Sequence, residues 1–419
     1  MMEQARLHYR SFTEAPDPKQ IDVLFGVRAL FVFLVGWYHI WQQGWLSSFR
    51  VLGVTVDVYF LVSTGYLWVD GLLLLSGFLL YLPYAQAGTR LPSIGAFYKR
   101  RLIRILPSYL LCVVPMFVLG CVRGNYPTAW DAAKDLLAHL TFTHTLFDFS
   151  LFHSPINGAL WTLGVEMQFY LLFPFLARAY RKFPLLTWGG MAAVAFAFRW
   201  YAAQQADTSM YVNQLPAFLD VYANGFLAAT AFAAVHQRLG KDMDRKTKLV
   251  FTVGAAFFLC AVMMLVRAQS TCFQNTPLDY YEATRHGQLE RRFLFSCALS
   301  GFMLCAAFSL PPLRFLLGNW VMRFLASVSF QFYIYHQMLA VKLREWHFPP
   351  ADPWVDEDAA RQIMENSPRT RWDAAWQIRY TLLCFLLALV VAALITYLFE
   401  RPLARLLRRR THAEEKGGR

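Results

Sequence analysis

The sequence predicts an all-α polytopic integral membrane protein with about ten transmembrane helices. Hydrophobic residues make up 57% of the 419 residues and charged residues only 16%, whereas a soluble domain carries about 25% charged residues. The apolar runs are about 20 residues long, which suits a membrane-spanning helix and is about twice the length of a barrel strand. Only internally hydrogen-bonded helices and closed barrels satisfy the backbone inside a bilayer, so runs of this length favour helices.

The predicted spans follow one another along nearly the whole chain, and polar or charged segments separate them. They cover residues 24–44, 66–84, 104–122, 159–177, 185–203, 216–235, 249–267, 292–310, 323–343 and 377–399. This division leaves an N-terminal cytoplasmic segment 1–23, a transmembrane domain 24–399 and a basic cytoplasmic tail 400–419.

The placement of basic residues predicts the orientation. With the N-terminus inside, lysines and arginines are about twice as frequent in the inner segments as in the outer ones, which puts both termini in the cytoplasm. The net charge of +13 then follows from topology, and we expect no nucleic-acid partner. Polar residues fill positions 1–20, so we expect no cleaved signal peptide; the first span would direct insertion into the lipid bilayer of the plasma (inner) membrane.

Three features of the connecting segments lead to smaller predictions. The periodicity of Asp131–Leu140 predicts a helix lying at the membrane interface. Residues 356–364 are expected to form a short surface helix. Cys121 and Cys272 both fall near the outer face, where they would allow a disulfide, although two cysteines alone do not specify one. No metal-binding pattern occurs, so no metal is expected.

Arg28 and His39 lie eleven residues apart in the first predicted span. Eleven residues make about three helical turns, so the two side chains share one face of the helix. Ionisable groups in a membrane helix usually face the bundle interior or an aqueous cavity and indicate a pathway or a reaction site. The alternative is that Arg28 extends to the inner interface and that His39 bonds a neighbouring carbonyl.

Three further titratable residues fall at about the same predicted depth as His39. They are Asp70, Glu166 and His336, in the second, fourth and ninth spans. Consecutive spans usually pack side by side, so we expect His39 and Asp70 to meet. Four such groups at one depth predict a polar chamber. The alternative is a set of buried ion pairs that fixes the register of the helices.

A basic cluster opens the third predicted span. Arg100 and Arg104 are one helical turn apart, and Arg101 lies beside them. The planar guanidinium group binds phosphate through two parallel hydrogen bonds, so this cluster suits a phosphorylated ligand. The alternative is an anchor that fixes topology or binds lipid headgroups.

These motifs together resemble the membrane-bound acyltransferase 3 family, described by its O-antigen and Nod-factor O-acetylating members. Two departures occur: Leu72 and Leu73 replace a pair of phenylalanines, and Thr162 replaces a serine. The matching motifs, which span nearly the whole chain, are Arg28 with His39, V-D…S-G-F at 69–78, F-Y-x-R-R-x-x-R-I-x-P at 97–107, W-x-L-x-x-E-x-Q-F-Y-x-x-x-P at 161–174, Y-x-x-H at 333–336 and E-x-P at 400–402.

The resemblance implies an O-acyltransferase that moves an acyl group, usually acetyl, from cytoplasmic acyl-CoA to a hydroxyl of a carbohydrate or glycosylated small molecule. Arg28 and the basic cluster would bind the acyl-CoA. His39 would be the general base, oriented by Asp70, with Glu166 the third catalytic residue. The residues expected to contact the acceptor are Ser76, Trp161, Tyr170 and His336.

Two alternatives stay open at this point. Asp57 precedes Ser63 with the same spacing that separates Asp70 from Ser76, so Asp57 is a rival for the role of Asp70. The same buried charges would also serve a transporter or a non-catalytic membrane partner, although the two halves of the chain show no duplication of the kind common in transporters.

Overall fold

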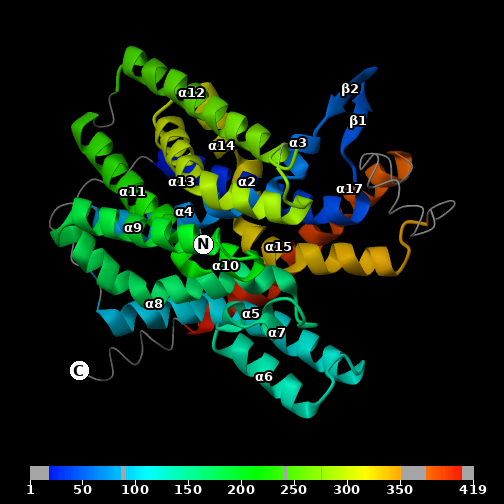
Figure 1. The fold of residues 1–419 in the computed structure, drawn as a ribbon. Helices are drawn as coiled ribbons and strands as arrows, with labels where there is room; N and C mark the ends of the chain where they lie inside the picture. Colours follow the sequence, from blue (N-terminus) through cyan, green and yellow to red (C-terminus); the bar gives the residue numbers. More distant parts are fainter. Residues whose placement is uncertain are drawn as a thin grey trace.

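The structure is a computed structural model that describes residues 18–85, 91, 93–239, 243–274, 276–350 and 374–407. Helices dominate these residues, and the strands among them form one short hairpin (Figure 1). The all-α class expected from the sequence is therefore confirmed. The N-terminal residues 1–17, the predicted surface helix 356–364 and the basic tail from residue 408 lie outside the described residues.

The elements follow the chain in this order: α2 (Pro18–Gly44), β1 (Ser48–Val51), β2 (Val54–Asp57), α3 (Tyr59–Val62), η1 (Gly65–Leu67), α4 (Trp68–Tyr81), η2 (Leu82–Tyr84), α5 (Ile94–Val122), α6 (Ala129–Leu140), η3 (His144–Leu146), α7 (Asp148–Leu151), η4 (Gly158–Leu160), α8 (Trp161–Lys182), α9 (Pro184–Ala202), α10 (Ser209–Val212), η5 (Leu215–Phe218), α11 (Leu219–Leu239), α12 (Arg245–Ser270), α13 (Tyr280–Ala307), α14 (Pro311–Gly318), α15 (Trp320–Glu345), α17 (Ala374–Leu394) and the π-helical η6 (Ile395–Glu400).

Each predicted span overlaps one long helix, which short helical segments extend at 66–84 (η1 and η2) and at 377–399 (η6). By length and apolar composition, seven helices among the described residues are able to cross a membrane, and the bent pair α13 and α14, which turns through 110°, makes an eighth if it is one span. α9 and α15 are helical but fall outside that set. The count of about ten and the cytoplasmic placement of both termini therefore stay predictions.

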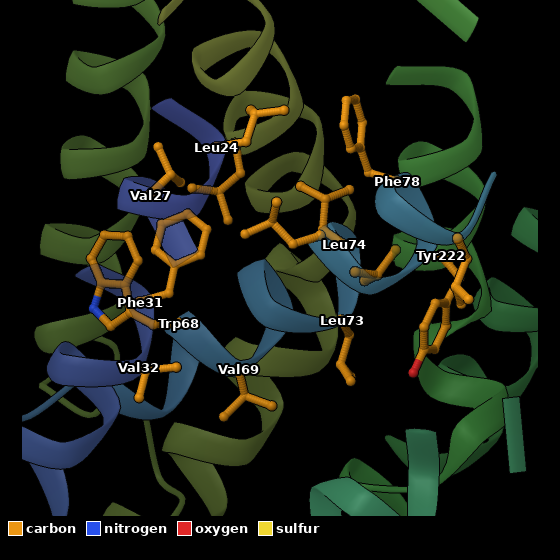
Figure 2. Close-up of a cluster of buried hydrophobic side chains, with 14 of the residues drawn as sticks. Leu24, Val27, Phe31, Val32, Trp68, Val69, Leu73, Leu74, Phe78 and Tyr222 are labelled. Carbon is orange, nitrogen blue, oxygen red and sulfur yellow. The ribbon is translucent and has the colours of Figure 1, made fainter. Parts of the chain in front are cut away.

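The helix that carries Arg28 and His39 is central to the packing. α2 contacts α15, α4 and α14. Figure 2 shows its apolar side chains against those of α4, where the rings of Phe31 and Trp68 stack 5.5 Å apart. At Gly26 the approach of α14 is so close that a Cβ would lie 1.6 Å from the carbonyl oxygen of Leu317.

The crossing of α4 and α11 also depends on glycine. A Cβ at Gly77 would lie 2.8 Å from the carbonyl oxygen of Tyr222, and a Cβ at Gly225 would lie 2.6 Å from that of Leu74. Ordinary side chains at these positions would push the two backbones apart, because interiors are close-packed and have no room to absorb the added atoms. The glycine of the Ser76–Gly77 motif is thus explained by helix packing.

The segments between the spans contain one predicted and one unexpected element. The helix predicted at Asp131–Leu140 is present as α6, and its place at the membrane interface stays a prediction. Its first turn is capped by the Thr128 hydroxyl, which accepts a hydrogen bond from the backbone N–H of Asp131. The unexpected element is the β1–β2 hairpin, whose two-residue turn has positive φ at Leu52 (49°) and Gly53 (83°). The hairpin projects beyond the helices at the upper right of Figure 1.

The cysteines do not form the disulfide that the sequence would have allowed. All seven are free thiols, and Cys121 is exposed. The Cys272 thiol instead lies 3.5 Å from the carbonyl oxygen of Ala283, which it faces across the α12–α13 connection.

Candidate active site

His39 on α2 and His336 on α15 form a hydrogen-bonded pair. The distance between His39 Nδ1 and His336 Nε2 is 2.7 Å, and the ring centroids lie 4.9 Å apart. His336 is buried, at 1% exposure, whereas His39 is partly exposed. Gly36, nearly one turn before His39, permits the close contact, since a Cβ there would lie 2.6 Å from the ring of Phe332. His39 is thus the more exposed member of the pair.

Asp70 is not the partner of His39, and the expected pairing of the two is wrong. The Asp70 carboxylate instead accepts a hydrogen bond of 3.2 Å from Arg292 Nε on α13. The two residues share a predicted depth and lie in consecutive spans, which usually pack side by side. Depth does not specify which face of α4 carries a side chain, and it is the next residue, Gly71, that faces α2, where a Cβ would touch the ring of Phe31.

A second buried ion pair lies beside the first. Arg199 on α9 donates two hydrogen bonds, of 2.8 and 2.6 Å, to the carboxylate of Asp220 on α11. Arg199 and Arg292 both also donate to the carbonyl oxygen of Ala217 in η5. Two arginines and two carboxylates therefore connect α4, α9, α11 and α13. For Asp70, this arrangement corresponds to the alternative considered from the sequence, a set of buried ion pairs that fixes the register of the helices.

Sequence reasoning missed Arg199, Asp220 and Arg292, although a signal for them was present. All three are charged residues inside predicted spans, where an unpaired charge is costly. An opposite charge at a similar depth would stabilise each of them. For Asp70 that partner is Arg292 and not a histidine.

Glu166 occupies a different place from His39. Its Oε1 accepts a hydrogen bond of 2.8 Å from the Ser76 hydroxyl of α4 and a second from the Tyr170 hydroxyl one turn further along α8. The expected single chamber with four titratable groups is therefore divided. His39 and His336 form one site, Asp70 belongs to the ion pairs, and Glu166 lies elsewhere.

The predicted donor-binding arginines gather around Glu166 and Tyr170. The Arg101 guanidinium carbon lies 5.4 Å from the centre of the Tyr170 ring. Arg28 and Arg101 are each close enough to interact electrostatically with Arg104, Glu166 and Tyr170. The structure thus brings together three of the four arginines that the sequence assigned to the acyl donor. We call Arg28, Arg101, Arg104, Glu166 and Tyr170 the arginine cluster.

The rim of the arginine cluster contains two more contacts. Arg100 is exposed and interacts with the hydroxyl of Tyr84 in η2. Glu400 in η6 interacts electrostatically with Arg28 and accepts a hydrogen bond of 2.7 Å from Gln331. Gln331 was not among the residues singled out in the sequence. With two carboxylates for three arginines, the cluster keeps an excess of positive charge that suits an anionic ligand.

An aromatic cluster adjoins His39 on the side away from Arg28. The ring of Tyr38 lies 5.1 Å from that of His39, 5.3 Å from Tyr66 and 6.3 Å from Trp41. Gln42 donates to the Tyr38 hydroxyl at 3.0 Å. These residues were not singled out in the sequence. Trp161, which was expected to contact the acceptor, stacks instead on Phe218 beside Arg292, with 6.2 Å between the ring centroids of Trp161 and Phe218.

A polar cluster outside the spans holds the segment before α8 in place. We call Tyr126, Asp135, His139 and Ser154 the outer polar cluster. Asp135 accepts hydrogen bonds from Tyr126 (2.7 Å) and Ser154 (2.6 Å), and His139 lies 3.2 Å from it. Burial opposes the ionisation of Asp135, but these hydrogen bonds outweigh it and lower the pKa of the carboxyl. The charged carboxylate is therefore the form that the fold favours.

His144 extends this outer polar cluster to α8. Its ring stacks on that of His139 with centroids 4.4 Å apart, and its Nε2 lies 3.2 Å from the carbonyl oxygen of Leu160. A Cβ at Gly164 would lie 2.9 Å from the His144 ring. Burial, assisted by the neighbouring His139, lowers the pKa of His144 to about 3, so the ring is neutral at ordinary pH.

Comparison with known proteins places these features in a family. The family model described as an acyltransferase domain, that of acyltransferase 3, matches residues 21–398, which include all the site residues named above except Glu400. No solved structure matches the chain.

Three curated relatives illustrate the similarity. Nodulation protein 10 of Rhizobium leguminosarum bv. viciae is 25% identical over 64% of this chain and 69% of its own length. The O-acetyltransferase OatA of Staphylococcus aureus is 32% identical over 38% of this chain, and the acyltransferase MdmB of Streptomyces mycarofaciens is 26% identical over 48%. The matched regions span only 25% of OatA and 52% of MdmB.

Proposed function

Because this chain belongs to the acyltransferase 3 family of membrane acyltransferases, we propose that it transfers an acyl group, usually acetyl, from acyl-CoA to a hydroxyl of a carbohydrate or glycosylated acceptor. The observation that carries the proposal is the arrangement along α2. One helix presents Arg28 to the arginine cluster and His39 to a buried histidine partner. The similarity to the O-acetyltransferase OatA supports transfer to oxygen.

The arginine cluster supports an anionic donor. Arg28, Arg101 and Arg104 outnumber the carboxylates beside them, and guanidinium groups bind phosphate with paired, charge-assisted hydrogen bonds. Coenzyme A carries such phosphates. Arg100, exposed at the rim, is proposed to make the first contact with them, and Glu166 to hold Arg28 and Arg101 in place through its charge.

The spacing along α2 supports a donor with a long arm. Eleven residues of helix separate Arg28 from His39, a distance of about 16 Å along the axis. The pantetheine arm of coenzyme A would run along this stretch and bring the thioester carbon to His39. Under this proposal the phosphates and the reacting carbon lie at different depths of the bundle.

His39 is proposed to be the general base. Its Nε2 would take the proton from the acceptor hydroxyl as the hydroxyl oxygen bonds to the thioester carbon, and the C–S bond would then break. The leaving thiolate would recover that proton from His39, so the products are the ester and free coenzyme A. No acyl-enzyme is required, although a transient one on a hydroxyl or on His39 would also balance.

The acceptor is proposed to approach through the aromatic cluster of Tyr38, Trp41 and Tyr66, next to His39. Aromatic faces and amide side chains such as that of Gln42 suit a sugar, which has apolar ring faces and polar hydroxyls. Ser76 and Tyr170, expected at the acceptor, bind Glu166 instead, so we assign them to the donor side. We propose the plasma membrane as the location.

The decisive experiment uses purified protein and labelled acetyl-CoA. Wild type should release coenzyme A and pass the label to an added glycan acceptor, whereas His39→Ala and His39→Gln should lower the rate by about 10²–10⁴-fold. His153→Ala, which removes an exposed histidine far from α2 in sequence, is the matched control. A wild type that neither consumes acetyl-CoA nor labels the acceptor would instead indicate a transporter or a non-catalytic partner.

The identity of the acceptor calls for a second measurement. Mass spectrometry of surface glycans from cells with and without the gene should show the loss of one acyl mass from one glycan. The size of that mass also distinguishes an acetyl from a longer or a succinyl donor.

A further inference from the structure

We propose that His336 is a positioning residue that fixes which nitrogen of His39 carries the proton. This inference rests on the proposed function, in which His39 is the general base. It replaces the expectation from the sequence that His336 contacts the acceptor.

The first step concerns His336 itself. Its Nδ1 lies 2.8 Å from the carbonyl oxygen of Tyr333 and 3.1 Å from that of Phe332. Carbonyl oxygens only accept hydrogen bonds, so Nδ1 must carry a proton and donate it. In a neutral imidazole the other nitrogen, Nε2, then has a lone pair and accepts.

The second step follows at His39. Its Nδ1 lies 2.7 Å from the accepting Nε2 of His336, so His39 Nδ1 must be the donor of that hydrogen bond. The proton of a neutral His39 is thereby held on Nδ1, and Nε2 keeps the lone pair. That is the state in which Nε2 removes a proton from a hydroxyl, and the hydrogen bond of the second nitrogen selects it.

The surroundings keep His336 in this orientation. Its ring lies nearly parallel to that of Phe332, with centroids 5.6 Å apart and an angle of 6°. Phe332 in turn contacts Phe33 of α2, at 4.4 Å between centroids. At 1% exposure, His336 offers no route for water to compete with His39. The partner of the base is therefore preorganised before the acceptor arrives.

The same geometry argues against direct contact between His336 and a substrate. One ring nitrogen is engaged by the carbonyls of its own helix and the other by His39. No hydrogen-bonding group of His336 is left for an acceptor. When His39 takes up a proton, its Nδ1–H becomes a cationic donor to His336 Nε2, and such charge-assisted bonds are about twice as strong as neutral ones.

The test compares three substitutions at His336. Gln places an accepting oxygen about where Nε2 lies and should keep the bond to His39, whereas Asn is too short to reach it and Leu has no acceptor. We expect His336→Leu and His336→Asn to lower kcat about 10²-fold or more, with the KM for acetyl-CoA within about threefold of wild type. His336→Gln should retain at least about ten times the kcat of His336→Asn. Tyr335→Phe, the adjacent residue, is the control.

A double substitution separates positioning from a structural role. If His336 acts through His39, then His336→Leu should cause no further loss in a His39→Ala background. Losses that multiply in the double variant, or equal kcat for the Gln and Asn variants, would overturn the proposal. Should the Leu variant fail to fold, the ratio of kcat between Gln and Asn decides alone.

Failure of this inference is distinguishable from failure of the proposed function. An inactive His39→Ala with a fully active His336→Leu would refute only the role of His336. A fully active His39→Ala would refute the general base, and with it the premise on which the role of His336 rests.

Discussion

Asp70 and Arg292 form an ion pair at 3.2 Å in which the side chains are 4% and 1% exposed. Neither residue is near the other in sequence, and the pair joins α4 to α13. Removing one member of a buried pair leaves the other charge without compensation, whereas replacing both with apolar residues is often neutral. The pair therefore permits a sharp test of whether Asp70 acts in the chemistry or in the packing.

We expect Asp70→Asn to destabilise the protein by about 3–5 kcal/mol and to lower acyl transfer with it. The double variant Asp70→Leu with Arg292→Met should recover much of the stability and of the transfer. Thermal unfolding in detergent and acetyl-CoA turnover measure the two. Asp57→Asn, at the exposed end of β2, is the control and should change neither. A stable but inactive double variant would return Asp70 to the chemistry.

The arginine cluster leads to a prediction about the donor. Arg101→Ala and Arg104→Ala should each raise the KM for acyl-CoA about tenfold or more, because a charge-assisted hydrogen bond is worth about 1.5–3 kcal/mol. The affinity for the acceptor should change little. Steady-state kinetics with each substrate varied in turn measures this, with Arg245→Ala on the exposed start of α12 as the matched control. Normal donor binding in both variants would leave the cluster as a topological anchor.

The contact between α2 and α14 predicts a large effect from a small change. A Cβ at position 26 would lie 1.6 Å from the backbone oxygen of Leu317, which no rotamer change relieves. Gly26→Ala should therefore lower stability by about 1–3 kcal/mol or more, the usual cost of overpacking. Gly189→Ala on α9, where a Cβ meets nothing within 4 Å, should raise it by up to about 1 kcal/mol. Equal melting temperatures for the two variants would contradict the packing described.

The outer polar cluster predicts a loss of stability in acid. The folded protein holds the pKa of His144 at about 3, whereas the unfolded chain binds a proton near pH 6.5, so the unfolded state gains protons first as the pH falls. The contribution of His144 to the free energy of unfolding is therefore largest above pH 6.5. It decreases by about 1.4 kcal/mol per pH unit as the pH falls from 6.5 toward 3.

The substitution His144→Phe keeps an aromatic ring beside His139, but the phenylalanine ring has no titratable group. Melting temperatures recorded from pH 7 to pH 4 should therefore fall less steeply for His144→Phe than for wild type. Parallel curves would assign the acid sensitivity to other groups.

The sequence was sufficient for the class of fold and for the place of each predicted span, because apolar runs of about 20 residues are long enough to indicate a membrane helix. It was also sufficient to select Arg28, Arg101 and Arg104 as one group, and the structure places these three arginines close together. It failed on the partner of His39. Helical period gives the face of a side chain relative to its own helix, but the neighbour opposite that face depends on how the helices pack.

The hairpin and the ion pairs illustrate two further limits. The β1–β2 hairpin is only eight paired residues in a chain of apolar helices, so its alternation was too short to stand out. Arg199 and Arg292 lay near the ends of predicted spans, where arginine often reaches the interface and needs no partner. Their sequence positions thus allowed either a paired or an interfacial arginine, and their burial beside Asp220 and Asp70 shows that each is paired with a carboxylate.

The continuity of α2 fixes the geometry of the proposed reaction in a way that loops could not. No proline interrupts the helix after its first residue, so Arg28 and His39 are joined by a rod whose length and twist are set by the peptide backbone. One residue inserted between them would turn His39 by about 100° relative to Arg28, whereas a whole added turn would restore its direction but move it about 5 Å further. The number of residues between Arg28 and His39 therefore sets the length of donor that can reach from the arginine cluster to the general base.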